Sequence, residues 1–532
     1  MRRIKRMVGV LAACVSMLGA VACASGEDGD AGERFGYQVA SDLRTTNAGS
    51  LEGRSLQAQV LSGRLYPGVY VPGPNGQMIP NTDLVKTQEI PGPERRVKYT
   101  LSQEAVFSDG TPVTCSDYLL AFTAGINPKV FGSSMPLFDD TADLQCTPGS
   151  KEFTVVFKEG RGARWRGLFE AGTVLPAHAV AAKLGMNLEQ LNQSLRAEDP
   201  AVLRPIADVW RRGFNLDAFD PQLQVSFGPY KIAGVGEHGE VDLVANEFFY
   251  GDAPVESELT VYPGSYDSEQ LALDGTLLVG ELRDATPTWH DPNAEGNRLV
   301  VSTVSGELTD MLVFPEIGPW SDEAKRRAIS RCIDPRSVAK AASDAVGSPV
   351  SLAPLHVLNN DDPLASRVED VAQPYLNVDI DAAREASGME LRVAAPYPSE
   401  RYAAMIASMA KTCEPAGVRI VDVTGEGKTL ADLPRIYINE AAERVELEGQ
   451  ADALLFAVDP MSAYPAALNR PENLSVLRAQ EGFLWNALPS LPLTAQPVTF
   501  AIDRNVGNVV PYTGLSGIGW NMNRWQHGPS HS

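Results

Sequence analysis

The sequence predicts an α/β protein built from more than one domain, and three observations lead to this fold class. The chain has 532 residues, which is too many for one hydrophobic core. Residues 391–424 read as strand, helix and strand, a βαβ unit whose two strands pair in parallel. Residues 96–125 read as a strand, a turn and a helix.

The strand in this second segment shows alternating apolar positions over residues 97–101, the pattern of a half-buried strand. Residues 108–110 are Ser-Asp-Gly, which favours a turn. Thr114 stands three residues before Asp117, the spacing of a helix capping box. Elsewhere we expect strands at 35–43, 69–71, 153–158, 230–232, 241–244 and 453–458, and helices at 56–65 and 322–341, the latter interrupted near Asp334-Pro335.

The N-terminus has the layout of an export signal. A basic start is followed by an apolar stretch up to Ala22, then Cys23 and an acidic, polar segment. We therefore expect a signal peptide over 1–22, lipidation of Cys23 and a flexible tether over 23–34. Cys14 is a closer local match to a lipidation site, but cleavage there would leave an apolar new terminus. An uncleaved membrane anchor is the alternative, although the apolar run is shorter than the roughly 20 residues a span needs.

Charge and motifs exclude several function classes. A net charge of −22 argues against a nucleic-acid partner. The sequence has no metalloprotease or nucleophile-elbow motif, and no Gly-x-Gly-x-x-Gly that opens an expected helix. Residues 425–429 (Gly-Glu-Gly-Lys-Thr) resemble the end of a phosphate-binding loop, but Asp422 occupies the position of its first glycine. We expect no catalytic residues, metal or cofactor, and we interpret His178, which has no positioned partner in the sequence, as structural.

Four cysteines remain beyond Cys14 and Cys23, and an even number in an exported chain indicates disulfides. Three pairings exist, of which we prefer Cys115–Cys146 with Cys332–Cys413. Cys332 and Cys413 each lie on the apolar face of an expected helix, so two inward-facing thiols can meet. The alternative is four buried thiols.

Several motifs carry a resemblance to one family. Residues 107–114 (Phe-Ser-Asp-Gly-Thr-Pro-Val-Thr) with Asp117, the series from Gly228-Pro229-Tyr230 to Pro254, and the segment 322–341 all match. Together they resemble the family 5 extracellular solute-binding proteins, the oligopeptide- and dipeptide-binding receptors of ABC importers. The resemblance runs from about Phe35 to Trp525.

This resemblance implies an α/β, two-lobed periplasmic-binding-protein-like fold (class II, hinge closure) with an extra domain in the first lobe. The implied division is a lobe I core of 35–60, 205–275 and 488–532, an additional lobe I domain of 61–204, and lobe II of 276–487. Ligands of such proteins favour the closed form by contacting both lobes.

For ligand contact, the resemblance points first to Asp459, at the end of an expected strand, where family members carry an Asp-rich loop. A helix or turn cap is the competing interpretation of this residue. Asn47, Tyr66 and Trp485 are weaker candidates, since amides and aromatic rings line such clefts, and ordinary packing is their alternative.

The expected function is that of a substrate-binding lipoprotein of an ABC transporter. It would capture peptides or peptide-like solutes, deliver them to permease subunits, and act as a monomer. It would be exported and held to the outer face of the cytoplasmic membrane by its lipid alone. One alternative is a cell-envelope lipoprotein of the same fold that acts as a regulator or scaffold. Another is a secreted hydrolase, which would need a nucleophile next to a base.

Overall fold

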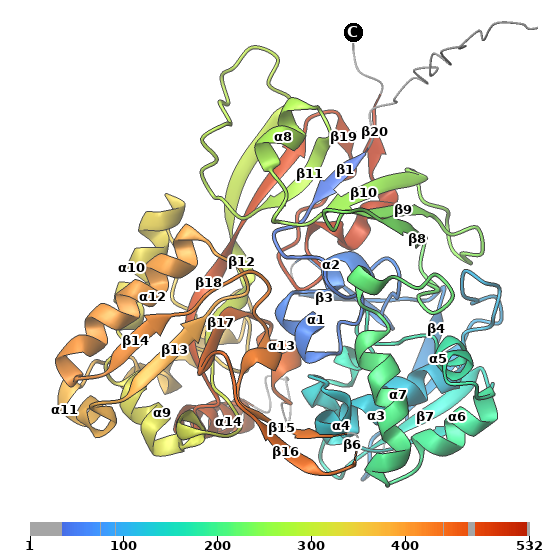
Figure 1. The fold of residues 1–532 in the computed structure, drawn as a ribbon, viewed down its shortest axis with the longest axis horizontal. Coiled ribbons are helices and arrows are strands. Elements are labelled where there is room, and N and C mark those ends of the chain that lie inside the picture. Colours follow the sequence, from blue (N-terminus) through green and yellow to red (C-terminus); the bar gives the residue numbers. More distant parts are fainter. Residues whose placement is uncertain (1–34, 75, 91, 440, 466–473, 529–532) are drawn as a thin grey trace, which may run out of the picture.

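The computed structural model describes residues 35–74, 76–90, 92–439, 441–465 and 474–528 (Figure 1). The expected signal peptide, Cys23 and the tether lie outside the described residues. In the described part of the chain, no helix has the length and apolar character needed to cross a membrane.

One sheet of ten strands runs through both lobes, in the order β14-β13-β17-β12-β18-β11-β1-β10-β9-β8. At the lobe II end lie β14 (Arg419–Asp422), β13 (Glu390–Ala394) and β17 (Ala453–Val458). At the lobe I end lie β11 (Leu277–Leu282), β1 (Gly36–Gln38), β10 (Glu258–Tyr262), β9 (Val241–Ala245) and β8 (Tyr230–Val235). β13 and β14 pair in parallel, as the βαβ pattern predicts.

Two long antiparallel strands connect the lobes. β12 (Leu299–Val313) and β18 (Ser490–Asp503) pair along nearly their whole length. The first part of β12 pairs with the final residues of β18, which in turn pair with β11 of lobe I, and the end of β12 pairs with β17 of lobe II. In Figure 1 these two strands descend from the upper sheet into the orange and yellow lobe. They are the covalent path across which the lobes can move relative to each other.

Helices cover the lobe II half of the sheet and bury an apolar core between them and the strands. They are α9 (Glu323–Ser330), α10 (Pro335–Val346), α11 (Ile380–Ala383), α12 (Glu400–Cys413) and α14 (Leu474–Ala487). A disulfide joins Cys332 to Cys413, whose Cα atoms are 4.7 Å apart. Cys332 lies in the turn after α9 rather than on a helix, because the interruption before Pro335 begins earlier than the sequence pattern indicates.

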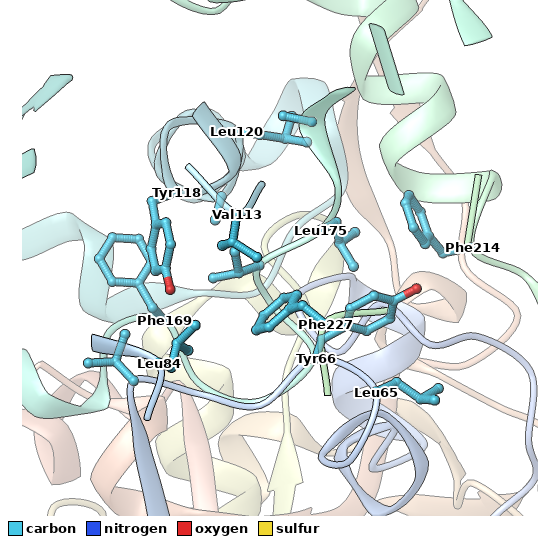
Figure 2. Close-up of a cluster of buried hydrophobic side chains, with 14 of the residues drawn as sticks. Leu65, Tyr66, Leu84, Val113, Tyr118, Leu120, Phe169, Leu175, Phe214 and Phe227 are labelled. Carbon is cyan, nitrogen blue, oxygen red and sulfur yellow. The ribbon is translucent and has the colours of Figure 1, made fainter. Parts of the chain in front are cut away.

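The additional lobe I domain contains an antiparallel sheet in the order β4-β5-β7-β6. Its strands are β4 (Val85–Ile90), β5 (Arg96–Leu101), β7 (Glu152–Phe157) and β6 (Thr141–Cys146). Its helices are α3 (Cys115–Ile126), α4 (Pro128–Phe131), α5 (Ala177–Lys183), α6 (Leu188–Leu195) and α7 (Pro200–Arg212), the last of which continues past the expected domain boundary at residue 204. Cys115 and Cys146 form the second disulfide of the preferred pairing. Figure 2 shows part of the core that this domain shares with the rest of lobe I, in which Tyr118 and Phe169 lie against each other.

The strand–turn–helix segment forms as its sequence predicts. Thr114 and Asp117 make the capping box at the start of α3. His178 has a structural partner that the sequence pattern did not reveal, because its Nε2 lies 3.0 Å from the Asp109 carboxylate and its ring packs on Phe107. The two motifs containing Asp109 and His178 therefore hold each other in place.

Short elements complete the fold. They are α1 (Leu51–Ser55), α2 (Gln59–Ser62), α8 (Ser268–Leu273) and α13 (Pro460–Ala463), and the two-stranded pairs β2 (Tyr70–Gly73) with β3 (Gln77–Pro80), β15 (Arg435–Ile438) with β16 (Arg444–Leu447), and β19 (Val506–Gly507) with β20 (Gln526–His527). The expected helix over 56–65 is confined to α2, and the strand expected over 35–43 is only β1.

The boundary between the lobes expected at residue 276 does not agree with the strand pairing of the structure. It would assign β11 to lobe II, but β11 pairs in parallel with β1 and antiparallel with the final residues of β18, in the lobe I half of the sheet. Periodicity identifies a strand but not its partners, so the boundary had no signal in the sequence.

Candidate functional site in the cleft between the lobes

Two adjoining chambers lie between the lobes. The first chamber has a volume of about 520 Å³ and the second about 630 Å³. Lobe I contributes the β2–β3 hairpin and the loop residues Ala163, Arg164, Arg166 and Gly167 to the first chamber. Lobe II contributes Asn359, Asp361, Asp362, Pro363, Asp459 and Met461. We call the residues that line both chambers the neck: Glu307, Asp361, Asp362, Pro363 and Tyr512. Each chamber is within the roughly 300–1,000 Å³ usual for small-molecule sites.

A bulge in β12 places Glu307 in the neck. Ser305 pairs with Pro497, and the next pair is Thr309 with Ala495. Between these two pairs β12 therefore has more residues than β18. Gly306 lies within the bulge, and a Cβ there would come 2.3 Å from the Gln496 carbonyl oxygen. Bulges redirect side chains at functional sites, and here the bulge lies where the strand passes from one lobe to the other.

Arg164 closes one side of the first chamber by bridging the lobes. Its Nη1 donates to the carbonyl oxygens of Pro460 (3.0 Å), Met461 (3.2 Å) and Tyr464 (2.7 Å), and its Nη2 donates to the Val357 carbonyl. The side chain is buried, and burial lowers the pKa of Arg164 to about 10, opposed by nearby carboxylates of which Asp459 acts most strongly. The closed arrangement thus pairs both terminal nitrogens of a buried cation with lobe II carbonyl groups, while its Nε has no partner among the described residues.

A second set of contacts joins the lobes around α1. The Arg54 guanidinium donates to the Ser462 hydroxyl of lobe II, and also pairs with Glu170 at 3.1 Å. The Leu430 amide of lobe II donates to the Ser55 hydroxyl at 2.8 Å. These contacts hold α1 against α13 and the segment before β15.

The β15–β16 hairpin makes a third contact between the lobes. Its Tyr437 ring lies under the guanidinium groups of Arg204 and Arg211, at 4.6 and 5.2 Å from the ring centroid. Both arginines also donate to the Tyr437 hydroxyl. In Figure 1 this hairpin extends from lobe II toward α4 and α7.

The cleft carries more carboxylates than cations. Glu170, Glu307, Asp361, Asp362 and Asp459 line the first chamber together with Arg164 and Arg166. Burial raises the pKa of Glu307 to about 7, and the negative charges of Asp361 and Asp459 act in the same direction. Burial also raises the pKa of Asp361. This excess of carboxylates is partly compensated, because Arg54 pairs with Glu170 and Arg164 acts on Asp459 and Asp362.

Polar atoms without partners also lie at the cleft. Asn359 contributes to the first chamber and Asn360 to the second. The Oδ1 of Asn359 and the Nδ2 of Asn360 are buried and have no hydrogen-bond partner among the described residues. Buried polar atoms normally find partners, so these two amides are available to a bound solute or to water.

Asp459, the first sequence candidate, lines the first chamber and also acts as a helix cap. Its Oδ1 accepts from the Met461 amide at 2.9 Å, and its Oδ2 accepts from the Ser462 hydroxyl at 2.8 Å. The cap interpretation is therefore confirmed, and ligand contact by Asp459 stays a prediction.

The other three candidates do not line either described chamber. Asn47 is fully buried, where its side chain donates to the Trp210 carbonyl oxygen and accepts from the Gly49 amide. Tyr66 packs between Phe214 and Phe227 in the hydrophobic core that the two parts of lobe I share (Figure 2). Trp485 stacks on Tyr375 in lobe II. Their polar or aromatic character serves packing, which was the alternative for all three.

Sequence reasoning missed Glu307, Arg164 and Tyr512. Gly306 before Glu307 in a β-rich segment was the only local signal, since an isolated glycine in a strand indicates a bulge. Arg164 lies in a loop whose partners are almost 200 to 300 residues away in sequence, a relationship that periodicity cannot reveal.

The family model for bacterial extracellular solute-binding proteins, family 5 (middle region), matches residues 80–386, more than half of the chain. The chain belongs to this family. Two similar relatives of this solute-binding protein come from Mycobacterium tuberculosis. One is an uncharacterized lipoprotein, 26% identical with 98% of each chain covered. The other, oligopeptide-binding protein OppA, is 27% identical over 27% of this chain and 24% of its own.

Solved structures show the same fold. This solute-binding protein aligns with the oligopeptide-binding protein AppA from Bacillus subtilis in complex with a nonapeptide, with a TM-score of 0.66, 13% identity, and 93% and 99% of the two chains covered. It aligns with the agropinic acid complex of AgaA from A. tumefaciens with a TM-score of 0.67 and 14% identity, again over 93% and 99%. It also aligns with the periplasmic EDTA-binding protein EppA, with a TM-score of 0.63 and 18% identity, over 93% of this chain and 96% of the other.

Proposed function

We propose that this protein captures a peptide or peptide-like solute in the cleft between its lobes and delivers it to the permease of an ABC transporter. The observation that carries the proposal is the pair of chambers lined by both lobes at the strands that connect them. A solute in the first chamber would contact the β2–β3 hairpin on one side and Asp459 on the other. Such contacts stabilise closure, because they exist only when both lobes meet the same ligand.

The related structures support this class of ligand. Solutes in their complexes range from a nonapeptide and a pentapeptide to agropinic acid. Backbone-like hydrogen bonding by Asn359 and Asn360 would suit a peptide, whose amide groups donate and accept along an extended chain. Water retained in so large a cleft would tolerate different side chains.

Lipidation of Cys23 after removal of residues 1–22, and attachment to the outer face of the cytoplasmic membrane, complete the proposal. Relatives named as lipoproteins support it. The same proposal holds that the protein makes and breaks no covalent bonds, acts as a monomer and uses no cofactor.

Native mass spectrometry of the full chain, purified in detergent, tests the function. We expect mass additions of several hundred daltons that disappear on denaturation and fragment as short peptides or related solutes. Uniform absence of such additions, together with no thermal shift across a library of di- to pentapeptides, would contradict the proposal.

A second candidate function is supported by the direct contacts between the lobes. Arg164, the Tyr437 hairpin and the α1 contacts stabilise closure from within the chain. A lipoprotein regulator or scaffold with one fixed shape would need such contacts. The same library separates the two functions, because a scaffold would show no solute-dependent thermal shift.

A further inference from the structure

A separate cavity of about 210 Å³ lies where the β15–β16 hairpin of lobe II meets lobe I, and we call it the seam pocket. It shares no lining residue with either solute chamber. Lobe I contributes residues 50–52, Gly132 and the end of α7, and lobe II contributes Ala431, Arg435, Tyr437 and Leu447. A group bound in the seam pocket would therefore contact both lobes without entering the solute site.

Three arginines line the seam pocket, namely Arg211, Arg212 and Arg435. Burial lowers the pKa of Arg211 to about 10, and the positive charges of neighbouring arginines, Arg212 and Arg435 among them, act in the same direction. Cations brought this close repel one another unless an anion lies between them. Such a cluster is unusual in a chain whose net charge is −22.

The carboxylates around the seam pocket do not cancel these charges. Asp208 lies 3.0 Å from Arg204 and 2.6 Å from Arg211, so two guanidinium groups share one carboxylate. Glu52 lines the pocket and acts electrostatically on Arg435. The nearby charged groups together leave a cationic excess: Arg204, Arg211, Arg212, Arg435 and Lys428 lie near Asp208, Glu52 and Asp432.

Hydrogen-bond donors around the seam pocket still lack acceptors. Within the part of the chain that the structure describes, Arg212 makes no hydrogen bond or ion pair. Arg435 donates only through Nη1, to the Ala431 carbonyl oxygen. The Tyr437 hydroxyl accepts from two arginines, so its own proton is left to donate. Donors from both lobes therefore surround one cavity, and an anion could accept from all of them.

We propose that the seam pocket binds a phosphate group through Arg212, Arg435 and Tyr437, and so links the β15–β16 hairpin to lobe I. The inference goes beyond the proposed function, because the solute chambers take no part in it. A phosphate has at least three terminal oxygens and can accept from several guanidinium groups at once, whereas a carboxylate has two. The cavity of about 210 Å³ exceeds several times the roughly 30 Å³ of one water molecule, which leaves room for a phosphate group.

Calorimetric titration of the full chain in non-ionic detergent, at constant ionic strength, tests the pocket with three probes: inorganic phosphate, glycerol 3-phosphate and acetate. We expect at least one of the two phosphate probes to bind about 10-fold or more tightly than acetate. Tighter binding of inorganic phosphate indicates a free anion, and tighter binding of glycerol 3-phosphate indicates a phosphate ester such as a lipid headgroup. Either result supports the proposal, whereas acetate binding as tightly as both would contradict it.

Variants of Arg212 assign the binding to the seam pocket. Arg212→Gln should lower phosphate affinity about 10- to 100-fold, as expected for a charge-assisted hydrogen bond. Arg212→Lys keeps the charge but not the planar fork and should lose less, about 3- to 10-fold. Arg419→Gln is the matched control, because it removes an equal charge from β14 of lobe II, where Arg419 pairs with Glu390 at 2.7 Å. It should leave phosphate affinity unchanged.

Amide hydrogen exchange tests the link between the lobes. Phosphate at about ten times its Kd should slow exchange of residues 435–447 about 10-fold, because an anion that binds only the docked hairpin opposes its release. The Arg212→Gln variant should show no such protection at the same phosphate concentration. If Arg212→Gln and Arg419→Gln bind phosphate equally, or if bound phosphate leaves exchange of the hairpin unchanged, the proposal is wrong. Neither result bears on solute binding, which the peptide library tests separately.

Discussion

Nη1 of Arg164 lies 3.0 Å from the carbonyl oxygen of Pro460, although the two residues stand on opposite sides of the cleft. The same guanidinium donates to three further lobe II carbonyl oxygens, those of Val357, Met461 and Tyr464. Separation of the lobes would break all of these bonds at once and expose the guanidinium to water. Arg164 therefore stabilises the closed form in addition to any stabilisation by a solute.

We expect Arg164→Lys to shift the protein toward an open form. A lysine ammonium has one nitrogen and cannot reach all four carbonyl oxygens. Loss of about 1.5–3 kcal/mol from charged hydrogen bonds corresponds to roughly a 10- to 100-fold fall in the closed-to-open ratio. Small-angle X-ray scattering should detect an increased radius of gyration.

Arg161→Lys is the matched control. Arg161 lies in the same loop, but its partner is Asp140 of the same domain, at 3.9 Å. Its substitution should leave the scattering curve unchanged. Equal radii of gyration for the Arg164 variant and the original protein would show that other contacts suffice for closure.

Local patterns predicted the secondary structure near the strand–turn–helix segment because its signals act over a few residues. The Thr114 and Asp117 capping box needs only helix geometry, and the βαβ unit of β13, α12 and β14 needs only periodicity. The family motifs then gave the two-lobed arrangement. Local patterns could not predict the cleft, because segments that lie far apart in the sequence form it. They are the β12 bulge, a lobe I loop at residues 163–167 and a C-terminal segment at 512–515.

Asp459 was found because it follows a recognisable buried strand, whereas Asn47, Tyr66 and Trp485 were chosen by residue type alone. Residue type does not distinguish a cleft from a core, since both contain aromatic rings and amides. Asn47 satisfies its amide against Trp210 and Gly49 inside lobe I. Distinguishing the two environments required the tertiary fold.

Removal of the Tyr437 ring should loosen the β15–β16 hairpin. Two arginines lie over this ring, and a cation–π contact contributes about 0.5–2 kcal/mol when partly desolvated. Tyr437→Leu should therefore raise amide hydrogen exchange of residues 435–447 by about 3- to 30-fold. Tyr437→Phe keeps the ring and should show a smaller increase. If the two variants exchange equally fast, the hydroxyl rather than the ring makes the contact.

Both disulfides should contribute similarly to stability despite their different loops. Cys115–Cys146 spans 31 residues and Cys332–Cys413 spans 81. Loop-closure entropy grows with the logarithm of the loop length, which gives about 3.7 and 4.5 kcal/mol. We expect the double alanine variant of either pair to lower the unfolding free energy by about 4 kcal/mol in chemical denaturation, if the loop model holds. A loss under 1 kcal/mol for either pair would contradict it.

Stability should fall as pH rises because of Glu281, a carboxyl that is 6% exposed in β11. Burial raises its folded pKa to about 7, only partly opposed by the Ile518 amide, which donates to it at 2.6 Å. In the unfolded chain its pKa is about 4.3.

Between these pKa values the folded protein retains a proton that the unfolded chain releases, so stability is complete below about pH 4.3 and is lost as pH rises toward 7. Glu281→Gln keeps an acceptor for the Ile518 amide but cannot ionise. Urea denaturation should show the original protein losing about 3 kcal/mol more than this variant between pH 4 and pH 8. Asp117, whose buried carboxyl has a pKa raised to about 6, acts in the same direction in both proteins and cancels in the comparison. Glu258→Gln, at an exposed position of β10, should follow the original protein, and parallel pH profiles for all three would mean that Glu281 ionises normally in the folded state.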